Sequence, residues 1–575
     1  MHHSLSLLRT FSAKLLGYAL CDVFPNVQLV QGGKDSIGFY YDCLLTQQVT
    51  DEVLPLIEER FGQICHSLPD IELMHMMREN AEEFFCYHKQ PLLAERAAQS
   101  PENIVELIKI GNFHDLYAAA ELPDNPKIKA FKFLSLTHED IFDSALGNLH
   151  VVRITATVFE ERSDLKAFMK KWTLHKKGAH QKFGTEMGLF HLLKTPREDA
   201  WIFFPRGEFI RDLLLNWCQQ GYQKQGYQKI SFTGLIPESF FPLKSLMHPV
   251  QSARWKFEWE GENYLHPTTD FSLAPLAMLG QQGKPPFRFF EIKQEYTRCP
   301  SNNLEGLLHS RTYQTSFAHL FCSDEQLLAE MISCLQFIDR TVKVFGFEHQ
   351  WILYPKAEKN AFAKNRWPKA VEFLHKALEF CGLTYEIDET STAWAGPRIE
   401  VKLMDSLGRL WSGPQIELDF YHLEHTVLAG QTKSQYVANS HWGVRWTALG
   451  SIERAIALLL EQKEGYLPLW VAPEQVRILS VGDDVAEYAK QLMDLMLNQN
   501  LRVTIDESQE ALGERIFAAT QQKISYIVIV GIKEKRENRM TVRSFGHQAV
   551  NANVKIEDFL SQVQEKIHNL KDNEH

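Results

Sequence analysis

The stretch LGSIERAIALLLE, residues 449–461, places a charged pair, Glu453 and Arg454, near the start of an apolar run that ends at Glu461. A helix that is apolar nearly all round is usually buried, and a buried arginine is almost always paired. The guanidinium of Arg454 is permanently charged, and its planar fork of donors matches the oxygens of a phosphate. The pattern therefore predicts that Arg454 binds an anion. The alternative is an ion pair with a carboxylate of a sheet, Glu417 or Asp419.

A second group of cations lies in DLKAFMKKWTLHKKGAHQKFG, residues 164–184, which has the periodicity of a helix. It carries one acid against the lysines at positions 166, 170, 171, 176, 177 and 182. A run of like charge is most often a solvated helix between domains, whereas the functional interpretation is a helix that faces phosphates.

The composition limits the partners and the compartment. The net charge is −11, so any contact with nucleic acid must come from local basic patches. The nine cysteines are scattered without a CxxC motif, which is typical of reduced thiols in a cytosolic protein. No apolar run reaches the length of a membrane span, and we expect neither a span nor a signal peptide. These observations predict a cytoplasmic protein.

The elements that must position these residues change in character along the chain. Residues 1–162 alternate short helices with strand-like runs, which predicts an α+β domain, and residues 163–184 form the basic linker helix. Residues 185–470 favour antiparallel strands, and 471–575 favour a small α/β domain with a partly parallel sheet. The predicted strands include 150–159, 229–234, 287–296, 349–354, 398–405 and 415–421, and the predicted helices 324–346 and 484–500.

The run LGSIERAIALLLEQKEGYLPLWVAPEQV, 449–476, resembles the third signature motif of class II aminoacyl-tRNA synthetases, in the version of the threonyl-tRNA synthetase family. GRLWSGPQIELDF (408–420), AGPRIE (395–400), RTYQTSFAHLFC (311–322) and HKKGAHQKFGTEMGLFHLL (175–193) match in order and spacing. The resemblance covers nearly the whole chain, without the ubiquitin-like domain that starts many members. It implies an editing-like domain, an antiparallel class II catalytic domain and an anticodon-binding-like domain. It also implies a motif-1 helix near 205–225, typical of dimers.

The resemblance implies a reaction in which ATP, with Mg²⁺, activates threonine for transfer to tRNA. Arg454 and Glu291 take catalytic positions of that site, and Arg454, Gln415 and Arg298 take positions that bind ATP. The second motif departs from the family. Thr297 and Cys299 take the positions of its Arg and Glu, and Arg298 is one residue out of register. Neighbouring strand residues face opposite sides, so Arg298 would reach the α-phosphate only across a bulge. In the same hairpin, another family arginine is replaced by His309.

The amino-acid pocket departs further. The family holds zinc through one Cys and two His, and here only His319 remains, with Asp270 and Arg445 at the other two positions. Arg cannot coordinate zinc, so we expect no zinc. We hypothesise that Asp270 and Arg445 pair in its place, beside Glu417. Phe317 and Thr315 replace an acid and a Gln of the family pocket.

The editing positions are replaced as well. Thr10 and Lys14 stand at the positions of the family's first two histidines, and Tyr117 and Glu121 at those of its Cys and His. No cysteine occurs between residues 87 and 217, so no shift of register restores the site. We expect hydrolytic editing to be lost.

The parts that would face tRNA match better. Lys170 and Lys177 lie on the basic helix, and Lys533, Glu534 and Arg543 match anticodon contacts of the family, although Phe545 replaces an arginine. Two hypotheses remain: an active ligase, or a non-catalytic paralogue that binds tRNA or regulates a full-length synthetase. Either could form a homodimer or pair with such a synthetase.

Overall fold

The computed structural model describes residues 2–35, 37–46, 49–100, 102–117, 122, 128–143, 145–178, 180–194, 199–231, 236–237, 256–259, 262–265, 286–296, 305–358, 365–393, 395–420, 441–544 and 550–568. The chain forms two compact units, Met1–Leu174 with Leu407–Arg409, and His175–Ser406 with Leu410–His575. No helix in the described ranges is long and apolar enough to cross a membrane.

The first unit contains two antiparallel sheets. Their strand orders are β1-β2-β7-β6 and β3-β4-β5, and the apolar helix α1 packs on β1 and β2. The core gathers side chains such as Phe11, Leu15, Tyr41 and Ile154. The bounds are α1 His2–Val23, β1 Gln28–Lys34, β2 Phe39–Leu44, η1 Asp51–Val53, α2 Leu54–Ser67, β3 Ile71–Met77, α3 Arg78–Tyr87, α4 Pro91–Ala98, β4 Ile104–Ile110, β5 Phe113–Leu116, β6 Ala130–Asp143 and β7 Gly147–Phe159.

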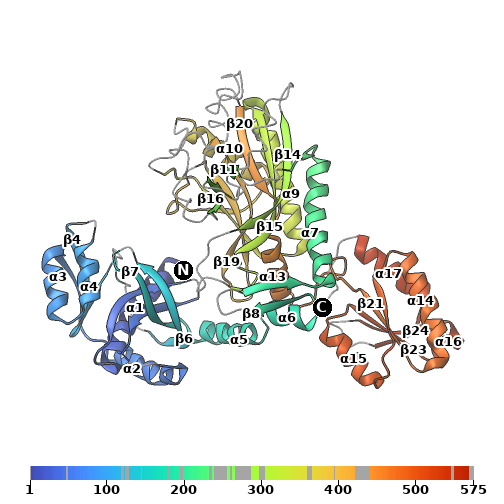
Figure 1. The fold of residues 1–575 in the computed structure, drawn as a ribbon, viewed down its shortest axis with the longest axis horizontal. Helices are drawn as coiled ribbons and strands as arrows, with labels where there is room; N and C mark the ends of the chain where they lie inside the picture. Colours follow the sequence, from blue (N-terminus) through green and yellow to red (C-terminus); the bar gives the residue numbers. More distant parts are fainter. Residues whose placement is uncertain are drawn as a thin grey trace. The chain divides into compact units, whose positions relative to one another are not determined.

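The second unit is built around an eight-stranded sheet, β10-β14-β15-β20-β19-β18-β16-β17 (Figure 1). The interior pairs are antiparallel, and only the edge strands β10 and β17 pair in parallel. The strands are β10 Gln228–Lys229, β14 Phe287–Tyr296, β15 Thr312–Ser323, β16 His349–Tyr354, β17 Tyr385–Ile387, β18 Arg398–Met404, β19 Leu410–Leu418 and β20 His441–Thr447. The associated helices are α7 Pro205–Lys224, α9 Asp324–Phe345, α10 Trp367–Phe380 and α13 Ile452–Gln462.

The two faces of this sheet differ because successive residues of a strand point to opposite sides. Phe290, Ala318, Trp446 and Ile416 point to the same apolar core, which α7 and α9 help to fill. Tyr222 of α7 lies in this core, and its hydroxyl is 3.2 Å from Ser316 Oγ. The alternate residues form the opposite, polar face.

The C-terminal sheet, β22-β21-β23-β24-β25, is parallel across β22, β21 and β23 and antiparallel thereafter. The prediction of an α/β domain with a partly parallel sheet is thus confirmed. The core includes α14 and α17, while α15 packs in a separate cluster. The bounds are β21 Val476–Ser480, η7 Asp483–Val485, α14 Ala486–Asn498, β22 Val503–Asp506, α15 Leu512–Gln521, β23 Tyr526–Val530, α16 Ile532–Glu537, β24 Arg539–Ser544, β25 Val550–Lys555 and α17 Ile556–His568.

Two predicted elements differ in the structure. The single helix predicted over 164–184 is assigned as two, α5 Arg162–Gly178 and α6 His180–Glu186. The strand predicted from 229 to 234 is described only as β10, and residues 232–235 lie outside the described ranges. The remaining strands are β8 Phe190–Lys194, β9 Asp199–Phe203, β11 Ile236–Pro237, β12 Lys256–Trp259 and β13 Glu262–Leu265.

Candidate functional site

The polar face of the eight-stranded sheet brings together residues from four strands. His319 on β15 lies opposite Arg445 on β20, which lies opposite Glu417 on β19. Opposite residues of paired strands share a face, so these three side chains form a row across the sheet. Their exposed fractions are 2%, 7% and 6%, so the row is buried.

The centre of the row is an ion pair. Arg445 Nη2 donates to Glu417 Oε2 at 2.6 Å, and the guanidinium carbon lies 5.7 Å from the centroid of the Phe317 ring. Burial raises the pKa of Glu417, and the charge of Arg445 opposes that shift. Asp270, the hypothesised partner of Arg445, lies outside the described residues. In the described part of the site, Arg445 forms an ion pair with Glu417.

This arrangement does not fit a zinc ion. A guanidinium offers only donors and cannot coordinate a metal, and here it is bound to the Glu417 carboxylate. A monovalent cation therefore stands where the family resemblance puts a metal ligand. The described residues include no group of three or more His, Cys, Asp or Glu side chains that could hold a metal.

Beside this pair, a carboxylate network occupies the same face. Glu291 on β14 is 1% exposed, and its Oε1 lies 3.1 Å from Lys293 Nζ and 3.3 Å from His319 Nε2. The family resemblance predicts a catalytic role for Glu291 and places His319 in the amino-acid pocket. The structure places them in contact, and the catalytic role of Glu291 stays a prediction.

Arg454 lies at the start of α13 and is held by backbone carbonyls. The Ser451 hydroxyl caps the helix by accepting from the Arg454 N–H at 3.2 Å. Arg454 Nε donates to the Leu308 carbonyl at 2.7 Å, and Nη1 donates to the Ser412 carbonyl at 2.8 Å. Burial lowers the pKa of Arg454, although Tyr313 and Glu400 act in the opposite direction.

The alternative prediction for Arg454, an ion pair with Glu417 or Asp419, is wrong. Glu417 pairs with Arg445, and no ion pair joins Arg454 to either carboxylate among the described residues. Two neutral carbonyls orient the guanidinium without neutralising it, so Arg454 keeps its net positive charge. It therefore remains able to bind an anion.

Gln415 lies on the same face, two residues before Glu417. It pairs in register with Thr447 on β20 and with Glu400 on β18. The other predicted ATP contact, Arg298, lies outside the described residues, as do Thr297 and Cys299. The binding of ATP by Arg454, Arg298 and Gln415 therefore stays a prediction.

The sequence shows the acid next to Arg454 but not its contacts. Glu453 Oε1 accepts from Arg211 Nη2 at 3.1 Å, and Oε2 accepts from the Gln314 N–H at 2.8 Å. Burial raises the pKa of Glu453, and Arg211 opposes the shift. These contacts fix α13 to α7 and β15. A buried acid at the start of an apolar helix was the available signal.

A second missed contact supports the turn that holds Arg454. His180 Nδ1 lies 2.8 Å from Glu461 Oε1, and the Leu307 N–H donates to His180 Nε2 at 3.0 Å. Nε2 accepts here, so Nδ1 carries the proton and donates to Glu461. Leu307 adjoins Leu308, whose carbonyl binds Arg454. His180 lay in a run that matched the family, but its residue type alone gave no sign of this role.

In the first unit, the predicted editing positions contain a buried ion pair. Lys14 Nζ lies 2.8 Å from Asp115 Oδ2, and the Tyr41 hydroxyl donates to the same oxygen at 2.8 Å. Thr10 Oγ1 donates to the Ser6 carbonyl of its own helix at 3.1 Å. Tyr117 is buried, which raises its pKa to about 12. Glu121 lies outside the described residues.

The predicted tRNA contacts have different surroundings. Lys170 and Lys533 are exposed, and Arg543 on β24 is half-buried. Glu534 instead binds its own domain, because its carboxylate accepts from the Gly531 N–H and the Thr541 hydroxyl, each at 3.0 Å. The side chain of Lys177, and Phe545, lie outside the described part of the chain.

Comparison with known proteins identifies the family. Residues 475–566 match the family described as anticodon binding domain. The chain is 30% identical to the threonine--tRNA ligase of Clostridium tetani, over 98% of this chain and 88% of that protein, and 29% identical, with the same coverage, to that of Clostridium kluyveri.

Solved structures agree in fold. The RNA binding domain of threonyl-tRNA synthetase from Cryptosporidium parvum aligns with a TM-score of 0.60 at 21% identity, over 68% of this chain and 98% of that one. A putative threonyl-tRNA synthetase from Aeropyrum pernix gives 0.58 at 18% identity, over 68% and 97% of the two chains. The predicted class II architecture is confirmed, and the chain belongs to the threonyl-tRNA synthetase family.

Proposed function

We propose that this chain is a tRNA-binding member of its family that does not activate threonine through a zinc ion. The Arg445–Glu417 ion pair carries this proposal, because it fills the amino-acid pocket position with a bound cation. Moving Arg445 aside for a metal would leave a buried carboxylate and guanidinium without each other, which is strongly unfavourable. The Arg445–Glu417 ion pair therefore takes the place of a metal in this pocket.

Binding of tRNA is supported by the C-terminal match and by the relatives, which are threonine--tRNA ligases. The exposed cations Lys170 and Lys533 are available to phosphates, which supply most of the affinity for nucleic acid. The protein would act as a non-catalytic paralogue, binding tRNA in the cytoplasm alone, as a dimer, or beside a full-length synthetase.

The second candidate is a ligase that activates an amino acid with ATP and Mg²⁺. Arg454 favours this candidate, because its guanidinium is bound by two neutral carbonyls and keeps its positive charge for a phosphate. Gln415 and Glu291 would then line the ATP and amino-acid sites, with Arg298 at the phosphate. The altered pocket would select a substrate other than threonine.

A filter-binding titration with labelled tRNA tests the first proposal. Lys533→Glu and Arg543→Glu should each weaken the binding of every tRNA. Each should also lower the slope of log association constant against log salt concentration by about 1. Lys490→Glu, an equally exposed lysine on α14, is the matched control. Failure of the unmodified chain to bind tRNA at physiological salt would refute the proposal.

A further inference from the structure

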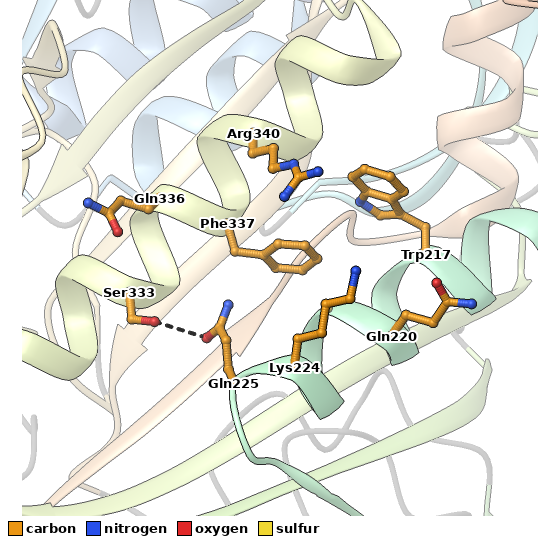
Figure 2. Close-up of a pocket in the computed structure, with 9 residues that line it drawn as sticks. Trp217, Gln220, Lys224, Gln225, Ser333, Gln336, Phe337 and Arg340 are labelled. Carbon is orange, nitrogen blue, oxygen red and sulfur yellow. Dashed lines mark hydrogen bonds between the residues drawn. The ribbon is translucent and has the colours of Figure 1, made fainter. Parts of the chain in front are cut away.

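A pocket of about 290 Å³ lies between α7 and α9, on the apolar side of the eight-stranded sheet (Figure 2). It is separate from the polar face, because α7 and α9 pack against residues that alternate with His319 and Arg445. Nothing in the proposed function uses it.

Two stacked rings form one wall. The Trp217 and Phe337 rings lie 6.4 Å apart with an interplanar angle of 17°. Gly221 lets the helices approach here, since a Cβ on it would lie 1.9 Å from Phe337 Cζ. The Trp217 Nε1–H donates to Thr341 Oγ1 at 3.1 Å, which fixes the indole. The pocket thus offers aromatic surface in a set orientation.

The rim of the pocket is rich in donors. Lys224 and Arg340 come from opposite helices and point toward the rings (Figure 2). The described residues that line the pocket include no acid, and neither cation forms an ion pair with any described carboxylate. The Ser333 hydroxyl donates to Gln225 Oε1 at 3.3 Å, which leaves the Gln225 amide N–H groups as further donors.

We propose that this pocket binds a mononucleotide, with the base against Trp217 and Phe337 and the phosphate between Lys224 and Arg340. Bases stack on aromatic side chains, and phosphates bind Lys and Arg through charge-assisted hydrogen bonds. The two features meet in one pocket, where the Arg340 guanidinium carbon lies 5.7 Å from the centroid of the Trp217 ring. The nucleotide comes either from solution or from an unpaired position of bound RNA.

Isothermal titration calorimetry with AMP, GMP, CMP and UMP tests whether the pocket binds a nucleotide from solution. The titration contains no tRNA, so its result is independent of the proposed function. Lys224→Glu and Arg340→Glu should each weaken binding about tenfold or more. Lys343→Glu, on the same helix outside the pocket, should leave it unchanged. Because a nucleotide could also reach Arg454, binding lost in Arg454→Ala but kept in both pocket variants would refute the proposal.

Photocrosslinking of tRNA that contains 4-thiouridine tests the RNA source. Crosslinks at Trp217 or Phe337 that disappear in Lys224→Glu would place an RNA nucleotide in the pocket. Absence of both mononucleotide binding and these crosslinks would overturn the proposal. It would also be overturned if the same variants changed only the sedimentation coefficient, because the pocket would then belong to an interface between copies.

Discussion

The two arginines of the polar face differ in what they can still bind. Arg445 is bound to the Glu417 carboxylate, whereas Arg454 is bound to the carbonyls of Leu308 and Ser412. A carboxylate cancels the charge of its partner, and a carbonyl does not. Any anion that enters this site should therefore bind at Arg454 rather than at Arg445.

Removal of one member of the central pair should be costly. Glu417→Leu removes the Glu417 carboxylate from a buried ion pair with Arg445, so we expect a loss of about 3 kcal/mol in the free energy of unfolding. The double variant Glu417→Leu with Arg445→Met should recover most of that loss. Urea unfolding of the unmodified chain and both variants measures the recovery, and equal stability of the single and double variants would contradict the account.

The same reasoning applies to the positions where the resemblance predicts the editing site. Lys14→Met leaves Asp115 buried with only neutral donors, including the Tyr41 hydroxyl, and should lower stability by about 3 kcal/mol. Thr10→Ala is the matched control on the same helix. Its hydroxyl bonds only to a carbonyl one turn earlier, so thermal unfolding should change little. If Lys14→Met leaves the stability unchanged, the Lys14–Asp115 ion pair does not stabilise the fold.

Glu534 should make the C-terminal domain sensitive to acid. Burial alone would raise the pKa of Glu534, but hydrogen bonds from the backbone and Thr541 outweigh it and lower the pKa. The stabilisation is therefore present above about pH 4.5 and is lost as the pH falls through the lowered value. Hydrogen exchange of residues 531–544 should be faster in Glu534→Gln than in the unmodified chain at pH 7. If the difference persists at pH 3, the carboxylate is not its source.

At the scale of elements, the alternation of apolar and polar residues predicted the strands that carry the site. Their exact bounds depend on pairing with neighbouring strands. The predicted ranges 287–296 and 349–354 agree with β14 and β16. The strand predicted from 415 begins instead at Leu410, because Ser412 pairs with Lys402 and Gln415 pairs with Glu400, so β19 continues across a register shift at Gly413 and Pro414. Local sequence could not supply that tertiary pairing.

The approach of α7 and α9 gives a test of packing between elements. Gly221→Ala should gain helix propensity but must displace Phe337, so we expect a net loss of about 1–3 kcal/mol. Gly513→Ala on α15 is the matched control, since a Cβ there meets no atom within 4 Å. It should be neutral or stabilising by about 1 kcal/mol. Thermal unfolding that ranks the two in the opposite order would refute the close packing.

At the scale of the whole molecule, the family and fold were predictable from sequence, and the contacts of the site were only partly so. The replacements at positions 14 and 445 were visible as residue types. Their partners, Asp115 and Glu417, depend on strand register across long separations, and the carbonyls that hold Arg454 leave no mark in the sequence. Motifs therefore located the sites, while the structure showed what fills them.

The two units share one feature. Each has a continuous apolar core, and each has a buried lysine or arginine paired with an acid at a position where the resemblance predicts a functional site. Such pairs inside intact cores are what the proposed non-catalytic role predicts.

The most direct test is ATP–pyrophosphate exchange by the full chain against each of the twenty amino acids, with zinc content measured on the same sample. The account predicts no exchange with threonine and no stoichiometric zinc, in a preparation that still binds tRNA. Threonine-dependent exchange together with one zinc ion per chain would contradict it. That result would show that the Arg445–Glu417 pair opens to admit the metal.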